Sequence, residues 1–236
     1  ILDIFSWQAI FYVQLLFVII VGIWFALRQP ETLAKINRVP FTISVFVSGI
    51  KEIYCYKDTV AYTFISALIT GSFMVYLSAS QQVFQLQYGL VDEFPYIFAC
   101  LALTVGGATF LNGKLVLKYG MEKLMRAALL GFLSVSLAYV LLFFNSKNPS
   151  IFVLLSFFGL QFFCLGFIFG NIRAIMMQPI GHIAGIGAAI TGFIATLFSV
   201  PLGTFIGGFI DTTALPMFIG FAACGFSSLV IYYILK

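Results

Sequence analysis

Charge is scarce in this chain of 236 residues. Asp, Glu, Lys and Arg together make up only 8% of it, whereas hydrophobic residues make up 62% and the mean hydropathy is +1.10. A water-soluble globular domain carries about 25% charged residues, because its surface must be hydrated. The shortage of charge therefore excludes a soluble fold and indicates that lipid surrounds much of the chain.

The residues that build metal and catalytic sites are equally few. The chain has one histidine, His182, and four cysteines that lie far apart without a CxxC pair. Structural zinc sites need such ligands at close spacing. Paired His, Asp or Glu groups, which an intramembrane enzyme would need, are absent from the apolar stretches. We therefore predict that the protein is not an enzyme and has no metal ion or cofactor.

Long apolar stretches are what the chain does have. Seven of them reach the roughly 20 residues that a helix needs to cross a bilayer. The predicted spans are 4–27, 60–86, 94–113, 126–144, 150–172, 182–209 and 214–235. The one long connection contains Phe41–Ile50, which is apolar enough to form a helix along the membrane surface. The sequence thus predicts an all-α membrane protein with about seven transmembrane helices and the lipid bilayer as its partner.

The basic residues predict an orientation, because those near short loops tend to stay on the cytoplasmic side. With the N-terminus outside, 11 of the 12 lysines and arginines are cytoplasmic and only Lys147 is outside. The cytoplasmic set is Arg28, Lys35, Arg38, Lys51, Lys57, Lys114, Lys118, Lys123, Arg126, Arg173 and Lys236. These residues form no continuous basic face, so no nucleic-acid partner is expected. We predict a multi-pass protein of the cytoplasmic (inner) membrane with its C-terminus in the cytoplasm.

The beginning of the chain bears on its completeness. It starts at Ile1, with neither an initiator Met nor a basic signal-peptide region. An outside N-terminus needs an earlier segment to export it. We therefore expect this sequence to be a fragment. Five preceding helices would make twelve with both ends cytoplasmic, an arrangement that favours a transporter.

The segment Gly113–Arg126 follows the third predicted span and reads GKLVLKYGMEKLMR. It has a glycine, a basic residue before an aromatic–glycine pair at Lys118 to Gly120, and a charged cluster that opens the next helix. This pattern resembles the inter-helix motif of the major facilitator superfamily. A tight turn needs Gly where a positive φ is required. An ordinary loop with positive charges is the alternative interpretation.

Further stretches resemble the Bcr/CflA branch of drug-resistance transporters. They are Tyr76-Leu-Ser-Ala-Ser80 with Tyr88-Gly89 beyond it, and Gly170-Asn171 through Pro179, His182 and Gly185 to Ala188-Ala189. Ser6 to Phe11 and Pro30 to Thr32 resemble the two ends of helix six. The order is similar to helices six to twelve of a twelve-helix transporter. The chain departs from the family where Gln81 and Gln82 follow Ser80, since family members commonly have Pro there.

The resemblance implies a domain organisation and a function. Residues 1–27 would be the last helix of the N-terminal bundle, 28–58 a cytoplasmic inter-bundle linker, and 59–236 the C-terminal six-helix bundle. The resemblance also implies a proton-driven transporter, monomeric at full length, that exports small drug-like compounds and carries protons through its missing N-terminal half. The alternative is a seven-helix membrane receptor with an outside N-terminus. A receptor would not explain the motif at Gly113–Arg126.

Polar residues inside the apolar spans are the candidates for substrate contact, since each must find a partner in hydrocarbon or face water. Tyr76 and Ser80 share a helix face, with Gln81 beside it. Gln161 is a lone amide at mid-membrane, and Asn171 follows ten residues later. We predict that these five residues bind an uncharged or weakly charged compound. The alternative for Gln161 and Asn171 is a bond to a neighbouring helix.

Other residues are predicted to serve the structure. They are Gly113, Lys118, Gly120, Arg126, Pro179 and Gly185. His182 could relay protons, but a role at the membrane interface is favoured because no carboxylate lies nearby in the sequence. No Asp or Glu lies at the middle of any predicted span. The group that couples transport to protons is therefore expected elsewhere.

Overall fold

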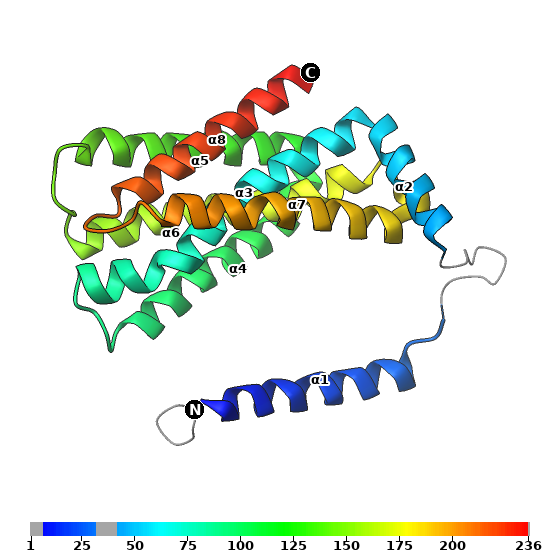
Figure 1. Cartoon of the computed structure of the whole chain (residues 1–236), viewed down its shortest axis with the longest axis horizontal. Coiled ribbons are helices and arrows are strands. Elements are labelled where there is room, and N and C mark those ends of the chain that lie inside the picture. The colour runs from blue at the N-terminus through cyan, green and yellow to red at the C-terminus, as the bar shows by residue number, and fades with distance from the viewer. Residues whose placement is uncertain (1–6, 32–41, 236) are drawn as a thin grey trace. The chain divides into compact units, whose positions relative to one another are not determined.

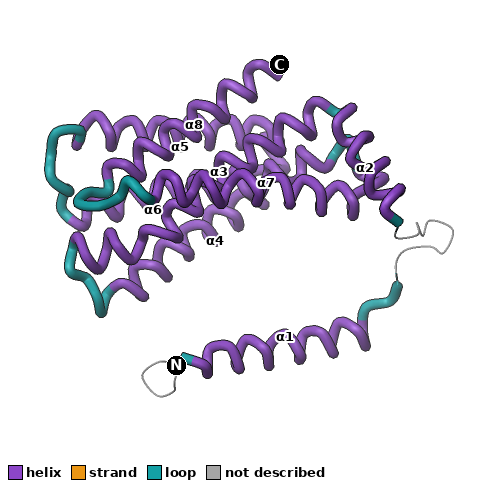
Figure 2. Tube along the Cα trace, in the orientation of Figure 1, coloured by secondary structure: helices purple, strands orange, loops and turns teal. Residues whose placement is uncertain are grey.

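The computed structural model describes residues 7–31 and 42–235, and all their regular structure is helical (Figures 1 and 2). The helices are α1 (Gln8–Arg28), α2 (Ile43–Cys55), α3 (Lys57–Gln81), α4 (Phe94–Tyr119), α5 (Met121–Phe143), α6 (Ile151–Met177), α7 (Ala184–Gly207) and α8 (Leu215–Leu235). A π-helix, η2 (Gln82–Gln87), continues α3, and a 3-10 turn, η3 (Gly181–Ile183), precedes α7. Seven residues named above lie outside the described residues, namely Ile1, Ser6, Thr32, Lys35, Arg38, Phe41 and Lys236.

Seven of the described helices are long and apolar enough to cross a membrane. They are α1, α3 with η2, α4, α5, α6, η3 with α7, and α8. A helix satisfies its own backbone N–H and C=O groups, which is what hydrocarbon demands of a spanning segment. The prediction of an all-α membrane protein with seven spans is confirmed.

The chain divides into two compact units, Ile1–Val45 and Phe46–Lys236. The first contains α1, whose only charged residue is Arg28 in its last turn. The second contains most of α2 and the six helices α3–α8. The predicted boundaries at 27 and 58 follow transporter topology and stay a prediction. Compactness instead groups residues 46–55 of α2 with the bundle, because Ile53 is buried there beside Ile180 and Ile190.

The helices α3–α8 run alternately between two ends of the second unit (Figure 1). We call the end beside α2, which has the α4–α5 and α6–α7 junctions, the α2 end, and the end with the other three interhelical loops the loop end (Figure 1). α3 packs against α6, α7 and α8, while α6 packs against α4 and α5. Aromatic rings fill the interior, as where Tyr139 of α5 stacks on Phe218 of α8 with ring centroids 3.7 Å apart. Polar residues that reach this interior therefore depend on their own helix or on a neighbouring helix for hydrogen-bond partners.

The predicted loop at Gly113–Arg126 was wrong in extent. α4 continues to Tyr119 and α5 begins at Met121, so that Gly120 alone separates them. Gly113 lies within α4, and its predicted place in a turn is not observed. Gly120 has φ 81°, a conformation that favours glycine, and here the prediction is confirmed. Charged residues do not oblige a helix to end at the membrane surface, because α4 can extend beyond it into water.

Candidate functional site

A small polar-lined cavity lies among α3, α6 and α7, nearer the α2 end. Its volume is about 220 Å³. The lining residues are Ser66, Thr70, Arg173, Met176, Met177, Ala188, Thr191, Gly192, Ala195 and Thr196. The set combines hydroxyl groups, two flexible thioethers and one guanidinium. It can therefore hold a part of a molecule that carries both apolar and polar groups.

The cavity follows from the spacing of small residues. Ser66 and Thr70 are four residues apart and share one face of α3. On α7, residues at spacings of three and four are small or hydroxylated, which leaves space against α3. Thr191 donates its hydroxyl to the Gly187 carbonyl at 2.7 Å, and Thr196 donates to the Gly192 carbonyl at 2.9 Å. Because both protons are used within the helix, these hydroxyl oxygens remain available as acceptors.

Tyr76 lies in an aromatic cluster away from this cavity. Its side chain is 1% exposed, and its ring contacts Phe73, Phe98, Phe158 and Phe162 at centroid distances between 4.6 and 6.4 Å. Its hydroxyl has no hydrogen-bond partner among the described residues. Tyr76 thus joins α3 to α4 and α6 through its ring, and its contact with a substrate stays a prediction.

Gln161 and Asn171 both bond to neighbouring helices. Gln161 is fully buried on α6 and donates its amide to the Ser136 hydroxyl of α5. The amide of Asn171 donates to Oδ1 of Asn112 on α4 at 2.7 Å and to the Phe167 carbonyl at 2.9 Å. This geometry favours the alternative interpretation, since apolar surroundings make an unpaired amide costly. Their contact with a substrate stays a prediction.

None of the five predicted substrate-binding residues lines the cavity. Ser80 is 2% exposed, and Gln81 is exposed at the end of α3, directly before η2. Spacing alone shows which residues share a face of a helix but not what that face meets. The small residues of α7 were the signal that could have indicated the cavity, because they leave the volume that a ligand needs.

The residues predicted to serve the structure lie near the α4–α5 and α6–α7 junctions of the α2 end. Lys118 places its ammonium 5.2 Å from the centroid of the Tyr119 ring, and Arg126 is exposed on α5. Pro179 lies between α6 and η3. Gly185 is the second residue of α7, and no atom lies within 4 Å of the position that a Cβ would take there. Gly185 therefore makes no close helix contact among the described residues.

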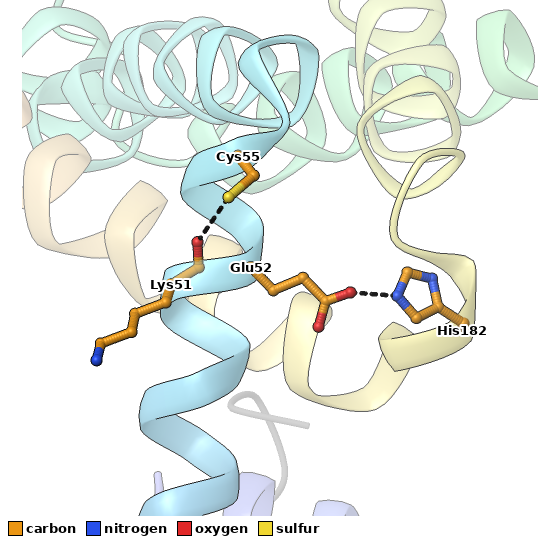
Figure 3. A network of polar contacts seen from close by, with 4 residues as sticks. All are labelled: Lys51, Glu52, Cys55 and His182. Atoms are coloured by element: carbon orange, nitrogen blue, oxygen red, sulfur yellow. Dashed lines mark hydrogen bonds and ion pairs between the residues drawn. The ribbon is translucent and has the colours of Figure 1, made fainter.

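His182 does have a carboxylate partner, contrary to the expectation from the sequence. Its Nε2 meets Oε1 of Glu52, which projects from α2 toward the histidine ring (Figure 3). The expectation was wrong because Glu52 lies 130 residues away in sequence. Both side chains remain substantially exposed, at 54% for His182 and 38% for Glu52. The pair lies at the surface of the α2 end, beside the isoleucines that dock α2.

The comparison with known proteins bears on the two classes that the sequence left open, a transporter and a seven-helix receptor. Residues 1–207 match the sequence model of the Major Facilitator Superfamily. The chain belongs to this superfamily. The match does not favour the receptor alternative.

Two curated proteins are similar to this chain. A "Bicyclomycin resistance protein homolog" of Haemophilus influenzae is 28% identical over 249 residues, which cover 98% of this chain and 58% of the relative. An "Uncharacterized MFS-type transporter YdgK" of Bacillus subtilis is 24% identical over 213 residues, covering 90% and 52%. The first confirms the resemblance to the Bcr/CflA branch. The chain thus spans little more than half the length of these relatives, and no solved structure matches it significantly.

The loop end of this superfamily member is held by a polar network. Gln87 donates to the Asp211 carbonyl at 2.9 Å, and Asn148 donates to Oε1 of Gln87 at 2.8 Å while its Oδ1 accepts from the Ala214 N–H at 2.9 Å. Tyr88 donates its hydroxyl to the Pro149 carbonyl at 2.7 Å, and burial raises the pKa of Tyr88 to about 12. The phenol therefore remains a donor throughout the physiological pH range. The network joins the three loops that connect α3–α8 at this end.

Proposed function

We propose that this chain is part of a secondary transporter that exports small drug-like compounds across the cytoplasmic membrane in exchange for protons. Membership of the major facilitator superfamily supports transport, and the similarity to a protein named for bicyclomycin resistance supports a drug-like substrate. The observation that carries the proposal is the cavity among α3, α6 and α7. Its lining suits binding and release rather than catalysis.

The size of the cavity is informative. Pockets for drug-sized ligands have volumes of about 300–1,000 Å³, whereas this cavity has about 220 Å³. It can enclose a part of such a ligand, with the rest bound by a second helical bundle. This is the arrangement of a transporter whose two halves move against each other around a shared site.

Proton coupling would require a titratable group within the membrane. The described carboxylates all lie in loops, in α2 or near a helix terminus. They are Glu31, Glu52, Asp58, Asp92, Glu93, Glu122 and Asp211. We therefore assign proton transfer to a part of the transporter beyond this chain.

The charge distribution supports the orientation in the cytoplasmic membrane. Among the described basic residues of the second unit, only Lys147 lies at the loop end. The others lie at the α2 end, which is therefore assigned to the cytoplasm, with the start of α1 outside.

A resistance panel tests the proposal. The Ala195→Phe substitution places a ring in the cavity and should abolish export of the larger compounds, whereas Ala99→Phe, at an exposed position of α4 outside the cavity, should leave export unchanged. Growth is measured against several unrelated compounds and normalised to membrane abundance, and proton-linked efflux is measured in inverted vesicles. If the Ala195→Phe variant gave the same resistance as the unsubstituted protein, the cavity would not be the substrate site. Efflux that persists without a proton gradient would contradict antiport.

A further inference from the structure

A long apolar groove runs along α3 between α7 and α8. It consists of three adjoining hollows of about 610, 490 and 500 Å³. The first two share Leu68, Leu202 and Phe205, and the second and third share Ile231. The α3 residues that line them, Lys57, Ala61, Phe64 and Leu68, recur every three or four positions, so the three hollows lie in line along one face of α3. We call them together the groove, which extends from the loop end to the α2 end. α8 diverges from α7 toward the α2 end, which leaves α3 as the floor (Figure 1).

The groove and the polar cavity lie on different sides of α3. Ser66 lines the cavity and Leu68 lines the groove. Two residues correspond to about 200° around a helix, so these side chains point in nearly opposite directions. α7 then separates the two spaces. The groove is therefore not an extension of the candidate substrate site.

The chemistry of the groove changes along its length. The two hollows toward the loop end have no charged lining residue. The second of them is lined by Phe64 and Phe198, whose ring centroids are 5.5 Å apart. The third hollow, at the α2 end, includes Lys57 and Tyr54 above Val60, Ala61, Ile231, Ile234 and Leu235. No ion pair of Lys57 is found among the described residues, and none joins it to Asp58 beside it. The groove thus has one cationic end and a long apolar remainder.

We propose that this groove binds an anionic phospholipid of the cytoplasmic leaflet. The Lys57 ammonium and the Tyr54 hydroxyl hold the phosphate, and an acyl chain lies on Ala61, Ile231 and Phe64 toward Leu202. Charge complementarity selects this occupant, because Lys57 lies at the end where basic residues gather and where the leaflet is negatively charged. The apolar length supplies the rest of the binding free energy, which a soluble anion could not use. This inference rests on the membrane-spanning bundle and on the orientation proposed above, but not on the proposed transport.

Native mass spectrometry of the purified protein in detergent tests the site. The protein is titrated with phosphatidylglycerol and, separately, with phosphatidylcholine of the same acyl chains. Phosphatidylglycerol should bind more tightly. Lys57→Gln should weaken its binding about fivefold, the contribution of one lysine near a membrane surface, while Lys57→Arg should retain it. Lys51→Gln is the matched control, since Lys51 does not line the groove.

A second pair of variants tests the apolar part. Ala61→Phe fills the groove below Lys57 and should reduce binding of both lipids, whereas Ala127→Phe, at an exposed position near the start of α5, should not. Glycerol phosphate, the headgroup without acyl chains, should not displace the lipid. Equal binding of the two lipids, unchanged binding by Lys57→Gln, or displacement by glycerol phosphate would overturn the proposal. If Ala61→Phe fails to fold, the Lys57 series alone decides.

Discussion

Asn171 illustrates how this bundle uses a polar residue inside hydrocarbon. The sequence places this amide on α6, and the structure pairs it with Asn112, 59 residues earlier. Two amides that satisfy each other can bridge α4 and α6 without water. A paired amide has less capacity to bind cargo, because its strongest donor and acceptor are already used.

Substitution at both positions tests this pairing. Asn171→Ala and Asn112→Ala should each lower stability by about 0.6 kcal/mol, the average for interhelical hydrogen bonds in membranes. The double variant should be little worse than either single one, since the same interaction is lost. The measurement is thermal unfolding in detergent together with a resistance panel. Should Asn171→Ala alone change which compounds are exported, Asn171 would belong to the substrate site.

Helix α2, like Asn171, is held by contacts with residues that lie far from it in the sequence. Its sequence is amphipathic, with Ile53 buried on the side that faces Ile180 and Ile190. Gly49 lies so close to α7 that a Cβ there would be 2.6 Å from Cγ2 of Ile186. The predicted helix along the membrane surface is thus present as a helix, and the bundle covers one of its faces. Its position relative to the bilayer stays a prediction.

Apolar packing should contribute more to the docking of α2 than the contact between Glu52 and His182 does. Ile53→Ala removes a buried side chain, a change that typically costs about 2–5 kcal/mol. Glu52→Gln removes only the carboxylate of a partly exposed contact with His182, and even a complete surface ion pair is worth about 0–1 kcal/mol. Hydrogen exchange of the α2 amides should therefore rise strongly in Ile53→Ala and slightly in Glu52→Gln. The reverse order would show that the His182 pair, and not the isoleucine cluster, holds α2.

The second unit as a whole has an asymmetric distribution of charge. Its loop end is joined by neutral hydrogen bonds among Gln87, Asn148 and the α7–α8 loop, while the α2 end carries nearly all of the described basic residues. Such asymmetry is what sets the orientation of a multi-span protein during insertion. The two ends are thus chemically distinct even though the helices between them are similar in composition.

Labelling of single cysteines in a Cys-free background tests the orientation. A cysteine at position 147 should react with a membrane-impermeant maleimide added outside intact cells. One at position 123 should react only after the membrane is permeabilised, because Lys123 opens α5 at the α2 end. The cysteine at 147 serves as the positive control for external labelling. The opposite pattern would invert the assigned topology.

The sequence by itself determined the fold class, the number of spans and the superfamily. These depend on long apolar segments and on local motifs, and hydrocarbon leaves a spanning segment few alternatives to a helix. The tertiary structure decided the partners. It paired Asn171 with Asn112, His182 with Glu52 and Gln161 with Ser136, and it placed the cavity on Ser66, Thr70 and α7 instead of Tyr76 and Gln161. The physical reason is that helical periodicity relates residues within a helix, whereas packing between helices sets which faces meet.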